Sequence, residues 1–208
     1  MLFFNSSMGS PDQKKFDAIL SAEDTFAHAV ALGVWVKRPM TAWHFLLPGM
    51  FIFDFLRRSQ AVRQYSAVFL YPRKVALEAA LGSIEGESPP KDETEGTIRQ
   101  WLDSLKMYSE ALLRAHLRLI AVLRDHYSKL LREEGKDYAS LLRKAYGTRE
   151  KYEGHLRRLV DAEQEIDRSV ADFRGQSQEI RERLQAEQNQ VEILRKKEMD
   201  RIFSKGGQ

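Results

Sequence analysis

Apolar residues recur at alternating four- and three-residue steps through most of the second half of the chain. One such series runs from Ile98 to Leu130, and a second, one residue out of phase with it, runs from Tyr138 to Leu194. A seven-residue repeat keeps one apolar stripe of a helix facing a neighbouring helix, as in a coiled coil. The seam residues that we expect on this stripe are Leu102, Leu105, Leu112, Leu119, Leu123, Leu130, Leu156, Leu159, Ile166, Val170, Phe173, Ile180, Leu184, Val191 and Leu194.

The phase slip between the two series coincides with a local signal for a helix end. Gly135 comes shortly before Asp137, and this arrangement resembles the end of one helix followed by the N-cap of the next. We therefore predict an antiparallel helical hairpin with its corner here. Gly147 and Thr148 have similar features, but the repeat stays in phase across them, so we expect the helix to continue there.

Polar residues also fall within these series. His116 and His126 lie on the seam, and neither has a His, Asp or Glu three or four residues away to complete a ligand pair. We interpret them as residues that set the register of the helices. Acidic residues such as Glu163 and Asp167 alternate with basic ones at helical spacing, which favours a mixed-charge, solvated surface.

A different pattern marks the segment 37–58, KRPMTAWHFLLPGMFIFDFLRR, in which two basic pairs bracket an apolar run with one acidic residue. A proline divides the run into two arms of about seven residues, each about 10 Å long if helical. Such arms reach the headgroup–acyl boundary of a bilayer but do not cross its hydrocarbon core of about 30 Å. We predict a re-entrant membrane anchor made of Lys37, Arg38, Trp43, Phe45, Leu46, Leu47, Pro48, Gly49, Phe51, Phe53, Asp54, Phe55, Arg57 and Arg58.

Two features of this segment favour a lipid environment, although a protein environment also explains its apolarity. Trp35 and Trp43 lie near the basic edges of the segment, and tryptophan is common at membrane interfaces. Asp54 precedes Arg57 and Arg58 by three and four residues, so a helix brings its carboxylate beside both guanidinium groups. In the alternative interpretation, the same aromatic residues form the closed core, or a partner-binding groove, of a soluble helical domain.

The composition of the chain changes near residue 90. Residues 1–90 contain nine of the eleven Phe but only 17 charged residues, whereas residues 91–208 contain 46 charged residues. We divide the chain into an apolar, aromatic-rich helical head (1–82), a flexible linker rich in Gly, Ser, Pro and acidic residues (83–96), and coiled-coil helices with a break near Gly135 (97–208). The predicted fold class is all-α.

Several classes of function find no support in the sequence. The net charge of +3 comes from 33 basic and 30 acidic residues, a balance that does not favour nucleic-acid binding. The absence of cysteine excludes disulfides, thiolate nucleophiles and zinc–thiolate sites. The GxxxxGK, GxGxxG, HExxH and GxSxG motifs are also absent. We therefore expect no enzymatic activity, no cofactor, no metal and no small-molecule substrate.

The function that these patterns favour is that of a non-enzymatic, membrane-associated coiled-coil scaffold or adaptor. The apolar head would attach it to the cytoplasmic, inner face of a membrane. The coiled-coil tail would bind a second copy of the chain, giving a homo-oligomer, or the helix of another protein. The alternative is a soluble, all-helical protein-interaction module.

Overall fold

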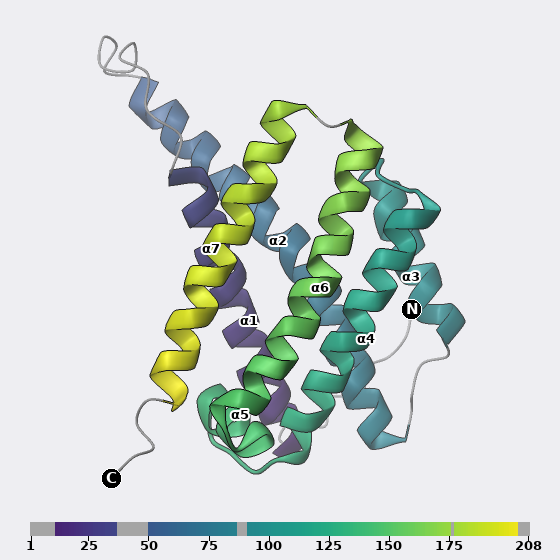
Figure 1. Cartoon of the computed structure of the whole chain (residues 1–208), viewed down its shortest axis with the longest axis vertical. Helices are drawn as coiled ribbons and strands as arrows, with labels where there is room; N and C mark the ends of the chain where they lie inside the picture. The colour runs from purple at the N-terminus through teal and green to yellow at the C-terminus, as the bar shows by residue number, and fades with distance from the viewer. Residues whose placement is uncertain (1–10, 37–49, 87–90, 176, 204–208) are drawn as a thin grey trace.

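The computed structural model describes residues 11–36, 50–86, 91–175 and 177–203, without the side chains of 35, 36, 50–58 and 91. The regular elements in these ranges are all α-helices (Figure 1), which confirms the predicted all-α fold class. They are α1 (Pro11–Val36), α2 (Met50–Glu85), α3 (Lys91–Ser104), α4 (Glu110–Arg132), α5 (Tyr138–Tyr146), α6 (Arg149–Arg174) and α7 (Gln178–Phe203).

Polar N-caps define where the helices of the second half begin. The Ser109 hydroxyl accepts a hydrogen bond from the Leu112 amide at the start of α4, and Asp137 forms a capping box with Ser140 at the start of α5. The position before that box favours glycine, because a β-carbon on Gly135 would lie 2.6 Å from the Ser140 hydroxyl oxygen. The predicted break near Gly135 is therefore present, between α4 and α5.

The continuous helix that we predicted across Gly147 is wrong. Gly147 caps the end of α5 with a positive φ of 69°, and the Thr148 hydroxyl caps the first turn of α6. Glycine adopts this backbone conformation at little steric cost, and the hydroxyl satisfies an amide that a helix start would otherwise leave free. These capping interactions end one helix and begin the next, although the apolar repeat stays in phase across the break.

The five long helices pack in the order α7, α1, α2, α4, α6 (Figure 1). α2 packs extensively on both α1 and α4, α6 packs on α4, and α7 packs on α1. The contact that would close this arc, between α6 and α7, is the least extensive of those between neighbouring long helices. Two helices that follow each other in sequence therefore rest mainly on different partners.

The predicted head and tail share one hydrophobic core. Ile19 of α1 and Leu77 of α2 belong to the same buried cluster as Leu123 of α4 and Leu142 of α5. Residues 83–85 end α2 and residues 91–96 begin α3, so helix extends into both ends of the predicted linker. The compositional change near residue 90 thus does not correspond to a boundary between two cores.

The seam residues differ in burial along the tail. Seven of the fifteen are buried, and they lie in α3, α4 and parts of α6 and α7: Leu102, Leu112, Leu119, Leu123, Leu130, Leu159 and Val191. Seven more are half-buried, Leu105 in the α3–α4 loop and six on α6 and α7: Leu156, Ile166, Val170, Ile180, Leu184 and Leu194. Phe173, near that turn, is 42% exposed. From Ile166 to Leu184, on both sides of the α6–α7 turn, the seam residues are therefore half-buried or exposed, whereas Leu159 and Val191 farther from the turn are buried.

Most of the predicted membrane anchor falls outside the described residues. This applies to Lys37, Arg38, Trp43, Phe45, Leu46, Leu47, Pro48 and Gly49. The remaining anchor residues lie in the first turns of α2, with their side chains outside the description: Phe51, Phe53, Asp54, Phe55, Arg57 and Arg58. In the described part of the chain, no helix has both the length and the apolarity that crossing a bilayer requires.

Candidate functional site: the α6–α7 groove

A groove of about 900 Å³ lies where α6 and α7 fail to pack closely, and we call it the α6–α7 groove. α2 provides its floor and α6 and α7 its walls, with smaller contributions from α3 and α4. The apolar side chains that line it are Val68, Phe69, Pro72, Trp101, Leu119, Leu156, Val160, Ile166, Val191 and Met199. Val68 is 42% exposed and Val160 is 37% exposed, so the groove presents apolar surface to solvent.

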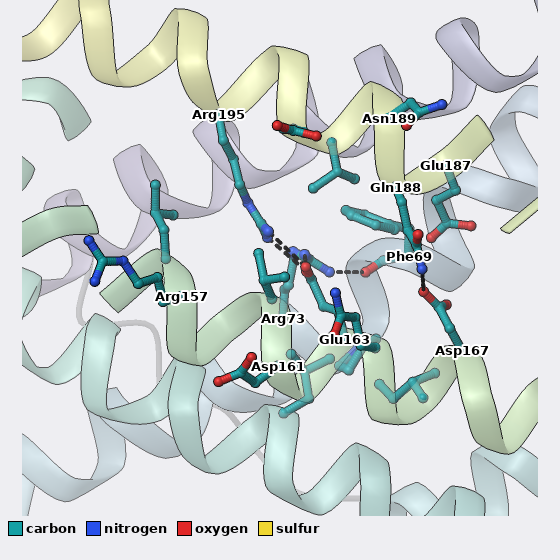
Figure 2. Close-up of a pocket in the computed structure, with 18 of the residues that line it drawn as sticks. Phe69, Arg73, Arg157, Asp161, Glu163, Asp167, Glu187, Gln188, Asn189 and Arg195 are labelled. Atoms are coloured by element: carbon teal, nitrogen blue, oxygen red, sulfur yellow. Dashed lines mark hydrogen bonds and ion pairs between the residues drawn. The ribbon is translucent and has the colours of Figure 1, made fainter. Parts of the chain in front are cut away.

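An ion network joins α2, α6 and α7 in the floor of this groove (Figure 2). The Glu163 carboxylate accepts two hydrogen bonds of 2.7 Å from Arg195, one from each terminal nitrogen, and one of 2.8 Å from Arg73. Arg73 also pairs with Glu23 of α1 at 3.2 Å. Burial alone would raise the pKa of Glu163, but the charges and hydrogen bonds of Arg195 and Arg73 hold the pKa below its usual value.

Pro72 contributes to this arrangement through the backbone of α2. Proline has no amide hydrogen and its ring disturbs the preceding helical turn. The Arg73 guanidinium donates a hydrogen bond of 3.1 Å to the Phe69 carbonyl oxygen and lies 3.8 Å from the centre of the Phe69 ring. The Arg73 guanidinium therefore contacts a backbone carbonyl, an aromatic ring and the carboxylates of Glu163 and Glu23. All of these contacts are within the protein.

Two further carboxylates face the groove closer to the α6–α7 turn. Asp167 on α6 accepts a hydrogen bond of 2.7 Å from the Gln188 amide of α7, and Glu187 lies beside Gln188 (Figure 2). Burial raises the pKa of Asp167 to about 6. Burial, together with the charge of Asp167, raises the pKa of Glu187 to about 7. Among the described residues, neither carboxylate forms a salt bridge with a lysine or arginine.

The Tyr65 hydroxyl is a third polar group at this end of the groove. Its oxygen is buried and lies close to the Glu187 carboxylate, but it forms no hydrogen bond of good geometry within the described ranges. Burial raises the pKa of Tyr65, and the nearby charge of Glu187 raises it further. A buried hydroxyl without a partner is uncommon in folded proteins and costs free energy. This end of the groove therefore holds three polar groups that its own residues satisfy incompletely.

The sequence-based interpretation of these acidic residues is wrong. Glu163 and Asp167 were expected on a solvated surface, but they line a partly apolar groove with perturbed pKa values. A signal was present, because Glu163 and Glu187 both fall on the seam of the apolar repeat. A charged residue on a face that packs against other helices has to be paired or reached by solvent.

A second cluster of titratable groups lies at the other end of the bundle, between α4, α5 and α6. The rings of His126 and His155 stack with their centres 4.3 Å apart and an interplanar angle of 8°. Nδ1 of His126 is 2.7 Å from the Tyr146 hydroxyl, whereas Nδ1 of His155 has no partner within the described residues. Burial lowers the pKa of His155 to about 3 and that of His126 well below its usual value, with the neighbouring His155 adding to the shift.

The two histidines that we expected to set helix register both take part in core packing. His126 belongs to the stacked pair, and the edge of His116 meets Trp101, with ring centres 5.2 Å apart. Nδ1 of His116 donates a hydrogen bond of 2.8 Å to the Leu112 carbonyl oxygen. In the described part of the chain, no group of three His, Asp or Glu side chains is placed to hold a metal ion.

Comparison with known proteins does not identify a family for this chain. No protein-family model, no curated protein and no solved structure matches it. The α6–α7 groove and the apolar segment 37–58 are therefore the two features that bear on function.

Proposed function

We propose that the protein is a non-enzymatic adaptor that binds a helix of a partner in the α6–α7 groove. The observation that carries this proposal is the open, partly apolar gap of about 900 Å³ between two helices that rest on different partners. Amphipathic helices commonly bind in such grooves with one apolar face inward. The uncovered seam residues toward the turn, including Ile166, extend the apolar surface that a partner would cover.

The length of the groove favours a helix over a compact ligand. Its lining on α7 extends from Gln185 to Met199, which corresponds to about 21 Å at 1.5 Å per residue. Four turns of an α-helix have about that length. A volume of this size also suits a small molecule, but such pockets enclose most of the ligand surface, whereas exposed Val68 and Val160 indicate a wide opening.

A selection of helical peptides tests this proposal. We expect a random library of helices of about 16 residues to yield binders with apolar residues at positions i, i+3, i+4 and i+7. Val160→Lys should weaken their binding at least tenfold, because it places a charge on the apolar wall of the groove. Ile193→Lys is the matched control, since Ile193 is 43% exposed on α7 and does not line the groove.

Two results would overturn helix binding in the groove. One is a library that yields no binders with amphipathic spacing. The other is a set of binders that tolerate Val160→Lys as well as they tolerate Ile193→Lys, because their site would then lie elsewhere on the surface.

We further propose that segment 37–58 attaches this adaptor to a membrane. Its apolar run, the basic pairs at its two ends and the tryptophan near one of them support the proposal. The first turns of α2 project beyond the rest of the bundle, which leaves room for such an attachment (Figure 1).

Flotation with liposomes that contain anionic lipids tests the attachment. The wild-type protein should float with the vesicles, and Phe51→Ser combined with Phe53→Ser should leave most of it in the soluble fraction, because two aromatic anchors are lost. Phe16→Ser combined with Phe203→Ser is a control that removes the same side chains from the bundle. Equal flotation of the wild-type protein and the Phe51/Phe53 variant would contradict the proposal.

A further inference from the structure

We propose that the partner helix is basic, and that one of its lysine or arginine side chains enters the groove between Asp167 and Glu187. This inference rests on the proposed helix-binding function and specifies the chemistry of the partner. It comes from the distribution of charge along the groove, which differs between the floor network and the end near the α6–α7 turn.

The floor network has no capacity for a further charge. Its two arginines, Arg73 and Arg195, are matched by the two carboxylates of Glu23 and Glu163, and the Glu163 carboxylate already accepts three hydrogen bonds. Tyr127 donates another hydrogen bond of 2.8 Å to Glu23. An incoming charged side chain would have to break one of these contacts, which makes the floor a poor binding site for an ion.

Asp167 and Glu187 are in the opposite situation. They project from opposite walls, and neighbouring negative charges disfavour the ionised form of each: Glu163 acts on Asp167, and Asp167 and Glu163 act on Glu187. The titratable groups that face them are Tyr65 and Arg73 of α2, Glu163 of α6, and Arg183 of α7. Arg73 is committed to Glu163, and the Arg183 guanidinium lies 5.8 Å from the centre of the Tyr65 ring.

A cation between the two walls would remove this imbalance. It would attract both carboxylates at once, and charged partners in a partly desolvated site interact more strongly than they do in water. A lysine or arginine also has a long apolar stem, which can lie along Ile166 while the charged end reaches the carboxylates. The Tyr65 hydroxyl, which lies close to Glu187, can accept a hydrogen bond from the same cation.

The other end of the groove carries charges of both signs. Arg149 is there, paired with Glu153 at 3.0 Å and with Asp200 at 2.9 Å, together with the exposed Arg157 and Lys196. The carboxylates of Glu153, Asp161 and Glu192 line the same stretch, so this end offers no unbalanced charge to a partner. The basic residue of the partner helix should therefore lie near the α6–α7 turn, where Asp167 and Glu187 form no salt bridge with a described lysine or arginine.

Fluorescence anisotropy with two matched peptides tests the inference. Both are helices of about 16 residues with leucines at i, i+3, i+4, i+7 and i+11; one has lysines beside the stripe near one end, and the other has glutamines at those positions. We expect the lysine peptide to bind the wild-type protein at pH 8 about tenfold more tightly, as close charge pairs in interfaces do. Asp167→Asn combined with Glu187→Gln should reduce this preference to less than twofold.

Asp172→Asn combined with Glu182→Gln is the matched control, because these exposed carboxylates lie on the same two helices and outside the groove. It removes the same charge and should keep the tenfold preference. The preference of the wild-type protein should also decline between pH 8 and pH 5, as Glu187 and then Asp167 become protonated. Circular dichroism of each variant establishes that the fold is retained.

The results separate the inference from the function on which it rests. Equal binding of both peptides, abolished by Val160→Lys, would overturn the basic partner and keep helix binding. A lysine preference that persists in the Asp167/Glu187 variant would place the basic contact elsewhere and overturn the inference. Failure of both peptides to bind would count against both proposals, as would a wild-type dimer that Val160→Lys converts to a monomer, since the groove would then hold a second copy.

Discussion

The carboxylates of the α6–α7 groove and the stacked histidines beneath α5 show two different outcomes of burying titratable groups. In both places burial disfavours the charged form, so the pKa of Glu187 rises to about 7 and the pKa of His155 falls to about 3. His155 is only 2% exposed and sits among aromatic rings, so it remains neutral as part of a closed core. The carboxylates lie in an open groove, where a partner can reach them.

The free-energy cost of burying a titratable group thus has different consequences in a closed core and in an open groove. A neutral histidine in a closed core contributes packing and makes the fold sensitive to acid. A carboxylate at the side of an open groove that is not paired with a cation can form an ion pair with a basic side chain of a partner. Arg195 connects the two regions, because it contributes to the lining of both the groove and a small cavity of about 30 Å³ beside His155.

The largest effect on stability is expected when Arg195 loses its ion pair with Glu163. Glu163→Gln removes the charge that holds Arg73 and Arg195 in their buried positions, and should lower the free energy of unfolding by about 3 kcal/mol. Urea denaturation at pH 7 measures the change. Glu165→Gln on the same helix is the control: Glu165 pairs with the exposed Arg118, and its loss should cost less than about 1 kcal/mol. Equal effects of the two substitutions would show that the floor network is no more important than a surface pair.

A smaller effect is expected from removing one histidine of the stacked pair. An unfolded histidine binds a proton below pH 6.5, whereas folded His155 does so only near pH 3, so its contribution to stability is present above pH 6.5 and is lost as the pH falls. Between pH 7 and pH 5 this loss amounts to about 2 kcal/mol for one such histidine. His155→Phe should remove most of that loss, as measured by urea denaturation at the two pH values.

His155→Gln separates titration from packing in this experiment. It also removes the titrating ring, so the stability should again depend less on pH, but the lost stacking on His126 should make the protein less stable at both pH values. If either variant loses as much stability as the wild-type protein between pH 7 and pH 5, the acid sensitivity does not originate in this pair.

The smallest effect on stability is expected in the groove and has the opposite dependence on pH. The raised pKa of Glu187 means that its contribution is present below its unfolded value of 4.5 and is lost as the pH rises through about 7. Glu187→Gln should therefore stabilise the free protein by about 1 kcal/mol at pH 8, after allowance for its partial exposure, and change little at pH 4. Glu182→Gln on the exposed face of α7 is the control in the same urea experiment. If Glu187→Gln instead destabilised the protein at pH 8, the charged Glu187 carboxylate would not be unfavourable in the free protein.

The repeat of apolar residues predicted which faces of the helices are buried better than it predicted where the helices end. Leu112, Leu119 and Leu123 are buried on α4 as expected. The breaks at Ser109, Gly147 and Gly175 were missed because a glycine or a capping hydroxyl can interrupt a helix without disturbing the phase of the repeat. Local chemistry determines helix ends, and it is not encoded in periodicity.

The repeat also does not specify which helix packs against which. The seam predicted a hairpin within the tail, and α4 does pack against α6, but α7 rests mainly on α1. Gly33 allows this close approach, since a β-carbon there would lie 2.1 Å from the Gln190 side chain. The floor network was equally inaccessible, because Arg73 and Glu163 are 90 residues apart and only the packing of α2 on the tail brings them together.

The single helix α2 has a mechanical consequence for the two ends of the molecule. It contains 36 residues, or about 54 Å, and runs from the segment that carries Phe51 and Phe53 to the groove floor at Phe69 and beyond. A tilt imposed on its first turns by a surface or a load would move the groove floor as well, because a helix transmits displacement along its axis. Pro72 removes one backbone hydrogen bond, so α2 bends most easily at this residue. A displacement of the first turns of α2 would thus be felt at the floor of the groove.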